Sequence, residues 1–427
     1  MHWVILLACA RFALVLTSNI FSDGILRYGA PESVGLLSGP LEDLVANISG
    51  FRCVLPGYDH PIDPSAAVIV AHQGTIVSHF ADGHMNLYAD SNGTYLQPNQ
   101  QLPAHLNTIW DMASLTKLFT TVAALKQIDE GKLSINETVA TYVPEFATNG
   151  KEGITILMLL THTSGFAPDP VPSLYSPNYT TVAQRRTAIV EQKIINPPGS
   201  TYLYSDLNFM NMMIVLETIT GQRLDALIGR FTSELGMHDT FFNRGNIPGP
   251  AFPPYARMAA QEFQIQVLGP AEPQRPQPVR GTVHDENAWA LDGVSGHAGL
   301  FSTVYDTAIF CQMILNNGSY GGKRILHPET IDLIFHDFNA RFEGDSHGLG
   351  FELNQYYWSG PMASLQTAGH TGFTGTSLAI DRPSNTLFIL FTNRVHPSRE
   401  WSSENIAREA LGYWVARSLG RNVTYPS

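Results

Sequence analysis

Basic residues are scarce in this chain of 427 residues. The 25 lysines and arginines are outnumbered by 37 aspartates and glutamates, which gives a formal net charge of −12, and no basic cluster offsets it. Nucleic acids and anionic membrane surfaces attract basic patches, so both are excluded as partners. Charged residues make up only 15% of the sequence and hydrophobic residues 44%. This composition predicts a large buried core in one large domain or two intimately packed domains.

Cysteine is scarce too, and the three in the sequence are Cys9, Cys53 and Cys311. Cys9 belongs to a predicted leader peptide, so two cysteines remain in the predicted mature chain. Two cysteines can form one disulfide or stay as buried thiols, but they cannot build a disulfide framework or a metal site. We predict structural roles for both.

The apolar run at the N-terminus, residues 4–16, is interrupted by Arg11 and is too short for a membrane span. Small residues follow it, so the pattern predicts a secretory signal peptide over residues 1–22, although a basic start is missing. An N-terminal core strand or a short anchor is the alternative. We expect the mature chain to be secreted and to contain no integral membrane span.

Six Asn-x-Ser/Thr sequons support this interpretation, because they are the acceptors of glycosylation in secreted proteins. Each match alone is a weak signal. The candidate glycosylation sites are Asn47, Asn92, Asn136, Asn178, Asn317 and Asn422.

Several catalytic motifs are missing. The sequence contains no His-Glu-x-x-His zinc motif and no Gly-x-Ser-x-Gly nucleophile turn. The segment from Gly369 to Gly375 precedes a predicted strand and not a helix, which excludes a dinucleotide fingerprint. His284, Asp285 and Glu286 are adjacent, and this spacing does not suit a metal ion. We therefore expect neither a metal nor an organic cofactor.

Apolar periodicity places strands near both ends of the chain and helices between them. Strand patterns lie at 66–71, 76–80, 376–381 and 387–392, and helical patterns at 40–48, 115–130, 154–162, 181–193, 206–220, 305–315 and 403–419. This order predicts an α+β fold with an antiparallel sheet of five or more strands, flanked by helices and formed by both chain ends. A mostly helical subdomain is inserted between them.

We expect a single domain over residues 23–427. Its α/β part covers about 23–132 and 282–427, and the helical insertion covers about 133–281. Eight prolines between Pro248 and Pro278 exclude a helix or a central strand there. A segment of this length without regular structure predicts a long ordered loop or a lid.

A serine and a lysine three residues apart open one of the predicted helices. Ser114 and Lys117 project from the same helical face, one turn apart and within mutual reach. An adjacent amine can take the proton of a serine hydroxyl, and the helix N-terminus offers free N–H groups to an oxyanion. The pattern alone is common by chance, and a capping serine beside a solvated lysine explains it better when nothing else supports it.

Such a pair also needs a proton relay to the leaving group and donors for the oxyanion. Tyr204 stands at a loop-to-helix junction, where a side chain can face a cleft. His370 lies in a glycine-rich segment that leads into a strand, and glycines such as Gly372 let the backbone approach a substrate closely. The alternative is that Tyr204 is a core aromatic and His370 a hydrogen-bonded buried histidine.

Together these segments resemble the superfamily of serine β-lactamases, penicillin-binding proteins and class C-like esterases. The three motifs, in the order and at intervals similar to those of the family, are Ser114-Leu115-Thr116-Lys117, Tyr204-Ser205-Asp206 and His370-Thr371-Gly372. The supporting segments are 159–166, 198–199, 296–302 and 348–351. The resemblance covers about residues 31–413.

The resemblance implies a β-lactamase-like catalytic domain and a role for each motif. It makes Ser114 the acylated nucleophile, Lys117 its base and Tyr204 the hydroxyl that relays the proton. His370 takes the place of the family's Lys or His on the edge strand, and the backbone N–H groups of Ser114 and Phe373 form the oxyanion hole. The implied substrate-binding and oxyanion residues are His370, Gly372, Phe373 and Asp206.

Two residues depart from the commonest family pattern. Asp206 stands where many members have asparagine, and its negative charge is expected to disfavour carboxylated substrates. His370 replaces the lysine of typical β-lactamases, which weakens the anchor for a substrate carboxylate. We expect neither change to affect acylation and both to disfavour lactam antibiotics. His162, at the end of a predicted helix, is expected to bond carbonyls or offset the helix dipole.

We therefore expect a secreted serine hydrolase that forms an acyl-enzyme on Ser114 and acts on a small-molecule carboxylic ester. One alternative is acyl transfer to an alcohol or amine of a small natural product. A second is β-lactamase or D-alanyl-D-alanine peptidase activity. A third is a catalytically inactive binding member.

Overall fold

A computed structural model describes residues 24–264, 275–401 and 405–426 of the chain. The predicted signal peptide, residues 1–22, lies outside these ranges. Within them, no helix is both long enough and apolar enough to cross a membrane.

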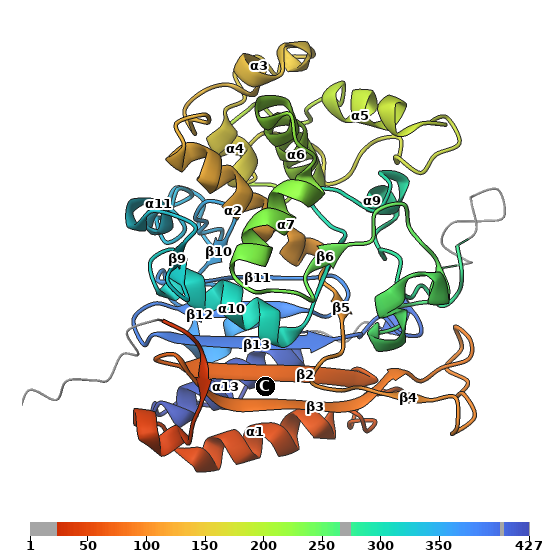
Figure 1. Ribbon diagram of the computed structural model, residues 1–427, viewed down its shortest axis with the longest axis vertical. Helices are drawn as coiled ribbons and strands as arrows, with labels where there is room; N and C mark the ends of the chain where they lie inside the picture. Colours follow the sequence, from red (N-terminus) through yellow and green to blue (C-terminus); the bar gives the residue numbers. More distant parts are fainter. Residues whose placement is uncertain (1–23, 265–274, 402–404, 427) are drawn as a thin grey trace, which may run out of the picture.

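A mixed sheet of eight strands runs through the lower half of the molecule (Figure 1). Its order is β1-β3-β2-β13-β12-β11-β10, with β4 paired to β3; β1 is parallel to β3 and the other pairs are antiparallel. The strands are β1 (Arg27–Tyr28), β2 (Ser65–His72), β3 (Thr75–Asn86), β4 (Leu102–Pro103), β10 (Glu352–Leu353), β11 (Thr367–Thr371), β12 (Ser377–Asp381) and β13 (Thr386–Thr392). The prediction that both chain ends build the sheet is confirmed.

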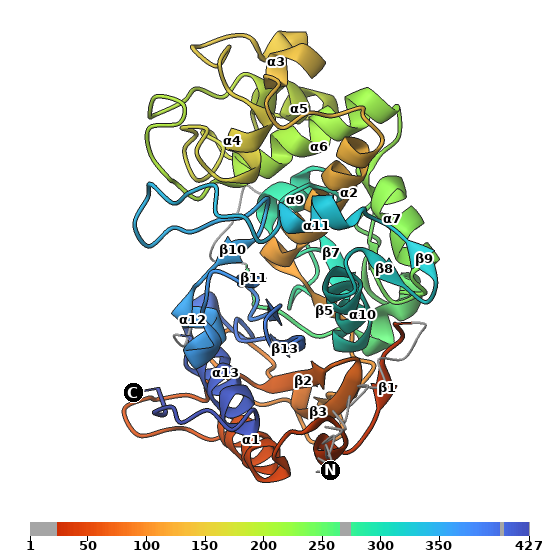
Figure 2. The same cartoon turned by 90° about the vertical axis from the view of Figure 1, so that its left-hand side faces the viewer.

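Helices cover both faces of this sheet, and the strands alternate accordingly. In β2, Val68 and Val70 belong to the core under α1 (Ser38–Gly50) and α13 (Ile406–Ser418). Ala67 and Ile69 belong to the larger core on the other face, where α10 (Val304–Leu315) crosses β2 and β13. Successive strand residues point to opposite faces of a sheet. The residues on both faces of β2 are therefore buried, each set in a different core. Figure 2 shows α1 and α13 together at one side of the sheet.

The central helix α2 (Thr116–Asp129) leads from the sheet into a mostly helical region at the top of Figure 1. It packs against α6 (Asp206–Thr220) and α7 (Leu224–Glu234). The remaining helices of this region are α3 (Val139–Tyr142), α4 (Ile156–Leu160) and α5 (Val182–Val190). Thr181 begins α5 with a capping box that includes Gln184.

Smaller elements complete the described parts of the chain. A three-stranded sheet has the order β5-β7-β6, so β6, which follows the helical region, returns to the α/β part. The small strands are β5 (Trp110–Asp111), β6 (Phe241–Phe242), β7 (Leu300–Ser302), β8 (Ser319–Tyr320) and β9 (Lys323–Arg324), and the short helices are α9 (Glu286–Ala290), α11 (Pro328–Asp332) and α12 (Tyr356–Ser359). The short 3₁₀ helices are Pro31–Val34, Ala113–Leu115, Pro144–Phe146, Gly249–Ala251, Pro253–Arg257, Gly360–Met362 and Arg399–Trp401.

Two details of the sequence prediction are wrong. The expected edge strand is β11, but β10 pairs with it at Ala368 and Gly369 and forms the edge itself. The two residues of β10 carry too little periodicity to reveal a strand. Ser114 lies in the 3₁₀ turn Ala113–Leu115 that precedes α2, and not in the α-helix.

Cys53 and Cys311 are both free, so the alternative of one disulfide is wrong. Cys311 is buried as expected, but Cys53 is exposed, so the expectation of a buried thiol is wrong for Cys53. Burial raises the pKa of the Cys311 thiol, which keeps it a neutral apolar side chain in α10. Of the six sequon asparagines, five are exposed. Asn47 is half-buried in α1, and its side-chain oxygen accepts hydrogen bonds from Trp414 and Tyr425.

Gly412 provides a test of the packing between α13 and α12. A Cβ at Gly412 would overlap the backbone carbonyl of Ser359, so Gly412→Ala is expected to destabilise the protein by about 1–3 kcal/mol. The matched control is Gly229→Ala in α7, where a Cβ meets open space and the helix gains about 0.5–1 kcal/mol. Urea unfolding of both variants measures the difference, and equal midpoints would contradict the close approach.

Candidate active site

Ser114 sits at the end of a strained turn that two hydrogen bonds hold. The preceding residue, Ala113, has a φ of 44°, in the left-handed region that residues other than glycine seldom adopt. The carboxylate of Asp111 accepts the Ala113 N–H at 2.9 Å and the His284 N–H at 2.6 Å. Strain of this kind persists where the surroundings over-determine the backbone, so the position of Ser114 is set by the fold.

The loop between β11 and β12 lies directly against this turn. Thr374 donates to the carbonyl of Asp111 at 2.7 Å, and Thr376 donates to that of Met112 at 3.1 Å. At Gly372 a Cβ would lie 2.6 Å from the Met112 carbonyl oxygen, closer than real contacts allow. Glycine is therefore required where the loop approaches Ser114.

Lys117 and Tyr204 both reach the hydroxyl of Ser114. The Lys117 Nζ lies 3.0 Å from the Ser114 Oγ, and the Tyr204 hydroxyl donates to the same oxygen at 2.9 Å. Lys117 is fully buried, and its Nζ also donates to the carbonyl of His297 at 3.2 Å. The structure thus brings together the serine, the lysine and the tyrosine that the sequence singles out.

Asp206 lies against the residue predicted to be the base. Its Oδ1 is 2.7 Å from the Nζ of Lys117, so the two side chains form an ion pair beside Ser114. The expectation that the aspartate leaves acylation untouched stays a prediction. The pair also offsets the negative charge that was expected to repel substrate carboxylates.

Tyr204 is held in place by the segment that follows α4. The Leu203 N–H donates to the carbonyl of His162 at 2.9 Å, and the Ser205 N–H donates to the His162 Nδ1 at 3.1 Å. Burial, followed by the charge of Asp206, raises the pKa of Tyr204 well above 10. The phenol is therefore protonated at neutral pH and acts as a donor to Ser114.

The side chain of His162 was expected to bond carbonyls or to offset a helix dipole. It does neither. Its Nδ1 accepts from the Ser205 amide and lies 3.0 Å from the Asn208 side-chain amide, while its ring lies 4.6 Å from that of Tyr204. Burial lowers the pKa of His162 well below 6.5, so the imidazole is neutral. The neutral ring of His162 packs against the ring of Tyr204 without adding a charge beside it.

His370, on β11, also lies beside Tyr204, with the ring centroids 5.8 Å apart. Its Nδ1 bonds the Thr371 carbonyl at 2.7 Å, and its Nε2 has no hydrogen-bond partner among the described residues. Burial, and then the charge of Lys117, lowers the pKa of His370 to about 3. A neutral imidazole cannot replace the charge of a lysine as a carboxylate anchor.

Phe373 follows Gly372 in the loop that lies against the turn of Ser114. Among the described residues, the Phe373 N–H has no hydrogen-bond partner. Ser114 lies in the first turn of a 3₁₀ helix, where N–H groups lack intrahelical partners. The Phe373 side chain is 46% exposed and stacks on His284, with the guanidinium of Arg394 over its face. The oxyanion role stays a prediction.

Two cavities meet at Ser114, Tyr204 and Phe373, which line both. The first, of about 450 Å³, contains Arg394 and Arg408, and we call it the arginine-side cavity. The second, of about 390 Å³, contains acidic residues, and we call it the aspartate-side cavity. Its acidic residues are Asp169, Asp206, Asp285 and Glu286.

Several residues that line these cavities were not predicted from the sequence. Glu352 lines the arginine-side cavity, and its Oε2 accepts from the Tyr357 hydroxyl and the Trp358 indole N–H. Burial raises the pKa of Glu352. The ligand-like atoms of Asp206, Asp285 and His297 lie within 4.8 Å of one another, a grouping that residue spacing cannot reveal because three segments contribute to it.

Comparison with known families agrees with this geometry. The model of the Beta-lactamase family matches residues 59–412, which is most of the chain. The chain belongs to the beta-lactamase family. This family comprises serine hydrolases, and its sequence model spans the segments that carry Ser114, Lys117, Tyr204 and His370.

Proteins that resemble this beta-lactamase family member in sequence or in structure carry different names. A protein of Salmonella agona, provisionally named a D-alanyl-D-alanine carboxypeptidase, is 32% identical over 401 residues, which cover 87% of each chain. The structure of EstCE1, a hydrolase with promiscuous acyltransferase activity, has a TM-score of 0.64 at 19% identity, covering 88% of this chain and 99% of that one. Simvastatin synthase from Aspergillus terreus has a TM-score of 0.64 at 17% identity, covering 88% and 98%. The two structural matches show the fold.

The buried neutral histidines predict how stability depends on pH. Burial lowers the pKa of His347 to about 4, whereas the unfolded side chain binds a proton near pH 6.5. Below pH 6.5 the unfolded state binds the extra proton, so the free energy of unfolding falls by on the order of 1 kcal/mol per pH unit towards pH 4. His347→Gln is expected to flatten this dependence, and the exposed control His105→Gln is expected to leave it unchanged. Urea unfolding between pH 4 and 7 measures both slopes.

Proposed function

We propose that the protein is a serine hydrolase that forms an acyl-enzyme on Ser114, passes the acyl group to water and acts on carboxylic esters. The observation that carries the proposal is the convergence of the Lys117 Nζ and the Tyr204 hydroxyl on the Ser114 Oγ, at the junction of two cavities. A nucleophile, a base and a proton donor within hydrogen-bonding distance are what acyl transfer requires. The donor set needs no cofactor for this reaction.

Acylation balances with these three groups. The Ser114 Oγ bonds to the substrate carbonyl carbon, its proton passes to the neutral amine of Lys117, and the carbonyl oxygen becomes an oxyanion. Backbone N–H groups of Ser114 and Phe373 stabilise that charge. Tyr204 gives its proton to the departing alkoxide and regains one from Lys117, so the alcohol leaves and an ester of Ser114 remains.

Deacylation repeats these chemical steps with water as the nucleophile. A water molecule on the acyl-enzyme loses its proton to the same lysine and tyrosine pair, and Ser114 regains it as the leaving group. An alcohol in the place of water gives acyl transfer instead. The similarity of fold to a hydrolase with acyltransferase activity supports including acceptor alcohols in any assay.

A second candidate function is hydrolysis of peptides that end in D-alanyl-D-alanine. Two observations favour it: the 32% identical relative bears that provisional name, and Arg394 and Arg408 line the cavity beside Ser114. Guanidinium groups bind carboxylates well, so this cavity suits a terminal carboxylate. Neutral His370 and the carboxyl of Glu352 in the same cavity favour an uncharged ester over such a peptide.

We also propose that the protein is secreted. The apolar N-terminal run and the sequons support this, and five of the six acceptor asparagines are exposed. Expression in a eukaryotic host tests the proposal. Protein in the medium that starts after the leader, and that loses mass on treatment with a glycosidase, would support it, whereas retention of an intact N-terminus inside the cell would contradict it.

The acyl-enzyme is the most direct test of the reaction. Brief exposure to short-chain aryl esters is expected to add the mass of the acyl group to one peptide, which contains Ser114. Ser114→Ala is expected to abolish the adduct. Lys117→Ala is expected to reduce kcat/KM by about 10³-fold or more, because groups that act as a unit fail together. Turnover like that of the wild type in either variant would refute the mechanism.

A substrate panel separates the candidate functions. We expect fast hydrolysis of a neutral aryl ester and slow or absent hydrolysis of a chromogenic cephalosporin and of a D-alanyl-D-alanine peptide, with kcat/KM as the measurement. A preference for the peptide would favour the second function. Addition of a short alcohol that diverts the acyl group from acid to ester would identify an acyltransferase.

A further inference from the structure

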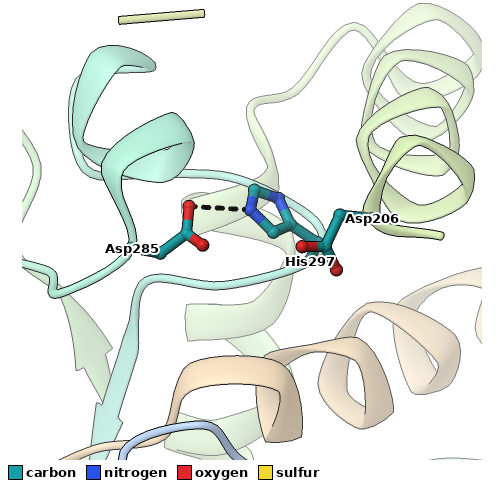
Figure 3. A group of neighbouring side chains, drawn as sticks. All are labelled: Asp206, Asp285 and His297. Atoms are coloured by element: carbon teal, nitrogen blue, oxygen red, sulfur yellow. Dashed lines mark hydrogen bonds and ion pairs between the residues drawn. The ribbon is translucent and has the colours of Figure 1, made fainter. Parts of the chain in front are cut away.

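Asp285 and His297 form a second charged pair behind the pair of Lys117 and Asp206. The His297 Nε2 lies 2.9 Å from the Asp285 Oδ1, and the His297 Nδ1 lies 2.8 Å from the Ser295 hydroxyl. The His297 side chain is only 1% exposed. Figure 3 shows its imidazole with Asp285 on one side and Asp206 on the other.

His297 contacts the catalytic lysine in two ways. Its backbone carbonyl accepts a hydrogen bond from the Lys117 Nζ at 3.2 Å. Its imidazole lies within 4.8 Å of a carboxylate oxygen of Asp206, whose Oδ1 is 2.7 Å from the same Nζ. The carboxylate of Asp206 therefore lies near two cationic groups, one on α2 and one on the loop before β7.

We propose that His297, held by Asp285, is a positioning residue for acylation, because its imidazolium shares Asp206 with Lys117 and so favours the neutral amine that accepts the proton of Ser114. The proposal rests on the acyl-enzyme function proposed above. Without a second cation, Asp206 would act on the lysine alone and hold it as an ammonium. An ammonium cannot take a proton, so acylation would start from a rarer form of the enzyme.

The charge states agree with this arrangement. Burial opposes the charged form of each partner, yet the Asp285 carboxylate raises the pKa of His297 above 6.5, and His297 holds the pKa of Asp285 well below its usual range. The hydrogen bond and the charge of the partner outweigh desolvation in both groups. The charged groups that act on His297 are Asp285 before α9, Asp206 on α6, Lys117 on α2 and Asp169 near the mouth of the aspartate-side cavity.

A metal ion is a poorer explanation of the same group. Asp206, Asp285 and His297 offer three ligand atoms, but the Lys117 Nζ lies 2.7 Å from the Asp206 Oδ1 and already occupies that oxygen. The His297 Nε2 also shares its proton with Asp285, so its lone pair is not free to bind a metal. The geometry suits a relay of charges better than a metal site.

The test is the pH dependence of the second-order rate constant with which a fluorophosphonate labels Ser114, measured by intact mass. In the wild type, labelling is expected to rise with pH to a plateau. In His297→Gln the midpoint of this rise is expected to move to higher pH by about one unit, because removing a nearby cation favours the ammonium of Lys117. Labelling at pH 6 is expected to fall about tenfold, with little change on the plateau.

Asp285→Asn is the second variant, since it removes the partner that keeps His297 charged. The amide oxygen of the new side chain can still accept the Ala288 N–H, so the cap of α9 is retained. We expect an alkaline shift smaller than in His297→Gln, because the negative charge of Asp285 is lost together with the positive charge of His297. The double variant is expected to have the same midpoint as Asp285→Asn, because both then lack the same two charges. Glu234→Gln is the control: it neutralises an exposed carboxylate at the end of α7, which lines neither cavity, and should leave the midpoint unmoved.

Each outcome decides between roles. A lower rate with an unmoved midpoint in both variants would make His297 a structural residue and overturn the proposal, and so would a shift to lower pH. Loss of wild-type labelling after dialysis against EDTA, restored by Zn²⁺, would make the three side chains metal ligands instead. Absence of labelling in the wild type at every pH would refute the proposed function itself.

Discussion

The buried amino group of Lys117 is the constraint on which the candidate active site depends. An amine removed from water is costly unless oxygen atoms replace its hydration shell. Here they come from Ser114 on its own turn, Asp206 on α6 and the carbonyl of His297 before β7, and the ring of Tyr204 lies 4.8 Å below. Three segments distant in sequence must therefore meet around one nitrogen. The helical region cannot move away from the sheet without leaving this buried nitrogen without its partners.

The two cavities give Ser114 two differently lined sides. Arg394 and Arg408 line the arginine-side cavity, which also contains Asp345 and Glu352. Asp169 and Asp285 line the aspartate-side cavity, which also contains Arg399. Phe373 stands between them, half-exposed, and lines both cavities. Charged side chains of both signs therefore line each cavity. The neutral histidines around Tyr204 add shape without adding charge.

The fold class could be predicted from the sequence because the apolar patterns of the main strands and helices extend over many residues. The apolar strands near both ends and the helix 206–220 correspond to β2, β13 and α6, the last with identical bounds. The motif residues also come together as the resemblance implied. What could not be predicted depends on contacts between distant segments: the ion pair of Asp206, the neutral state of His162, and the grouping of Asp285 with His297. Two-residue strands such as β10 are too short to leave a periodic pattern.

The pairing of β2 with β13 joins residues 66–72 to residues 386–392 at the centre of the sheet. A fully buried strand made early in synthesis therefore has no partner at its second edge until almost the whole chain has left the ribosome. At typical rates of about 5–20 residues per second, that interval lasts on the order of tens of seconds. β3 can pair with one edge of β2 meanwhile, and the other edge stays open to other chains. Newly made protein thus has to be guarded against aggregation until its last strands arrive.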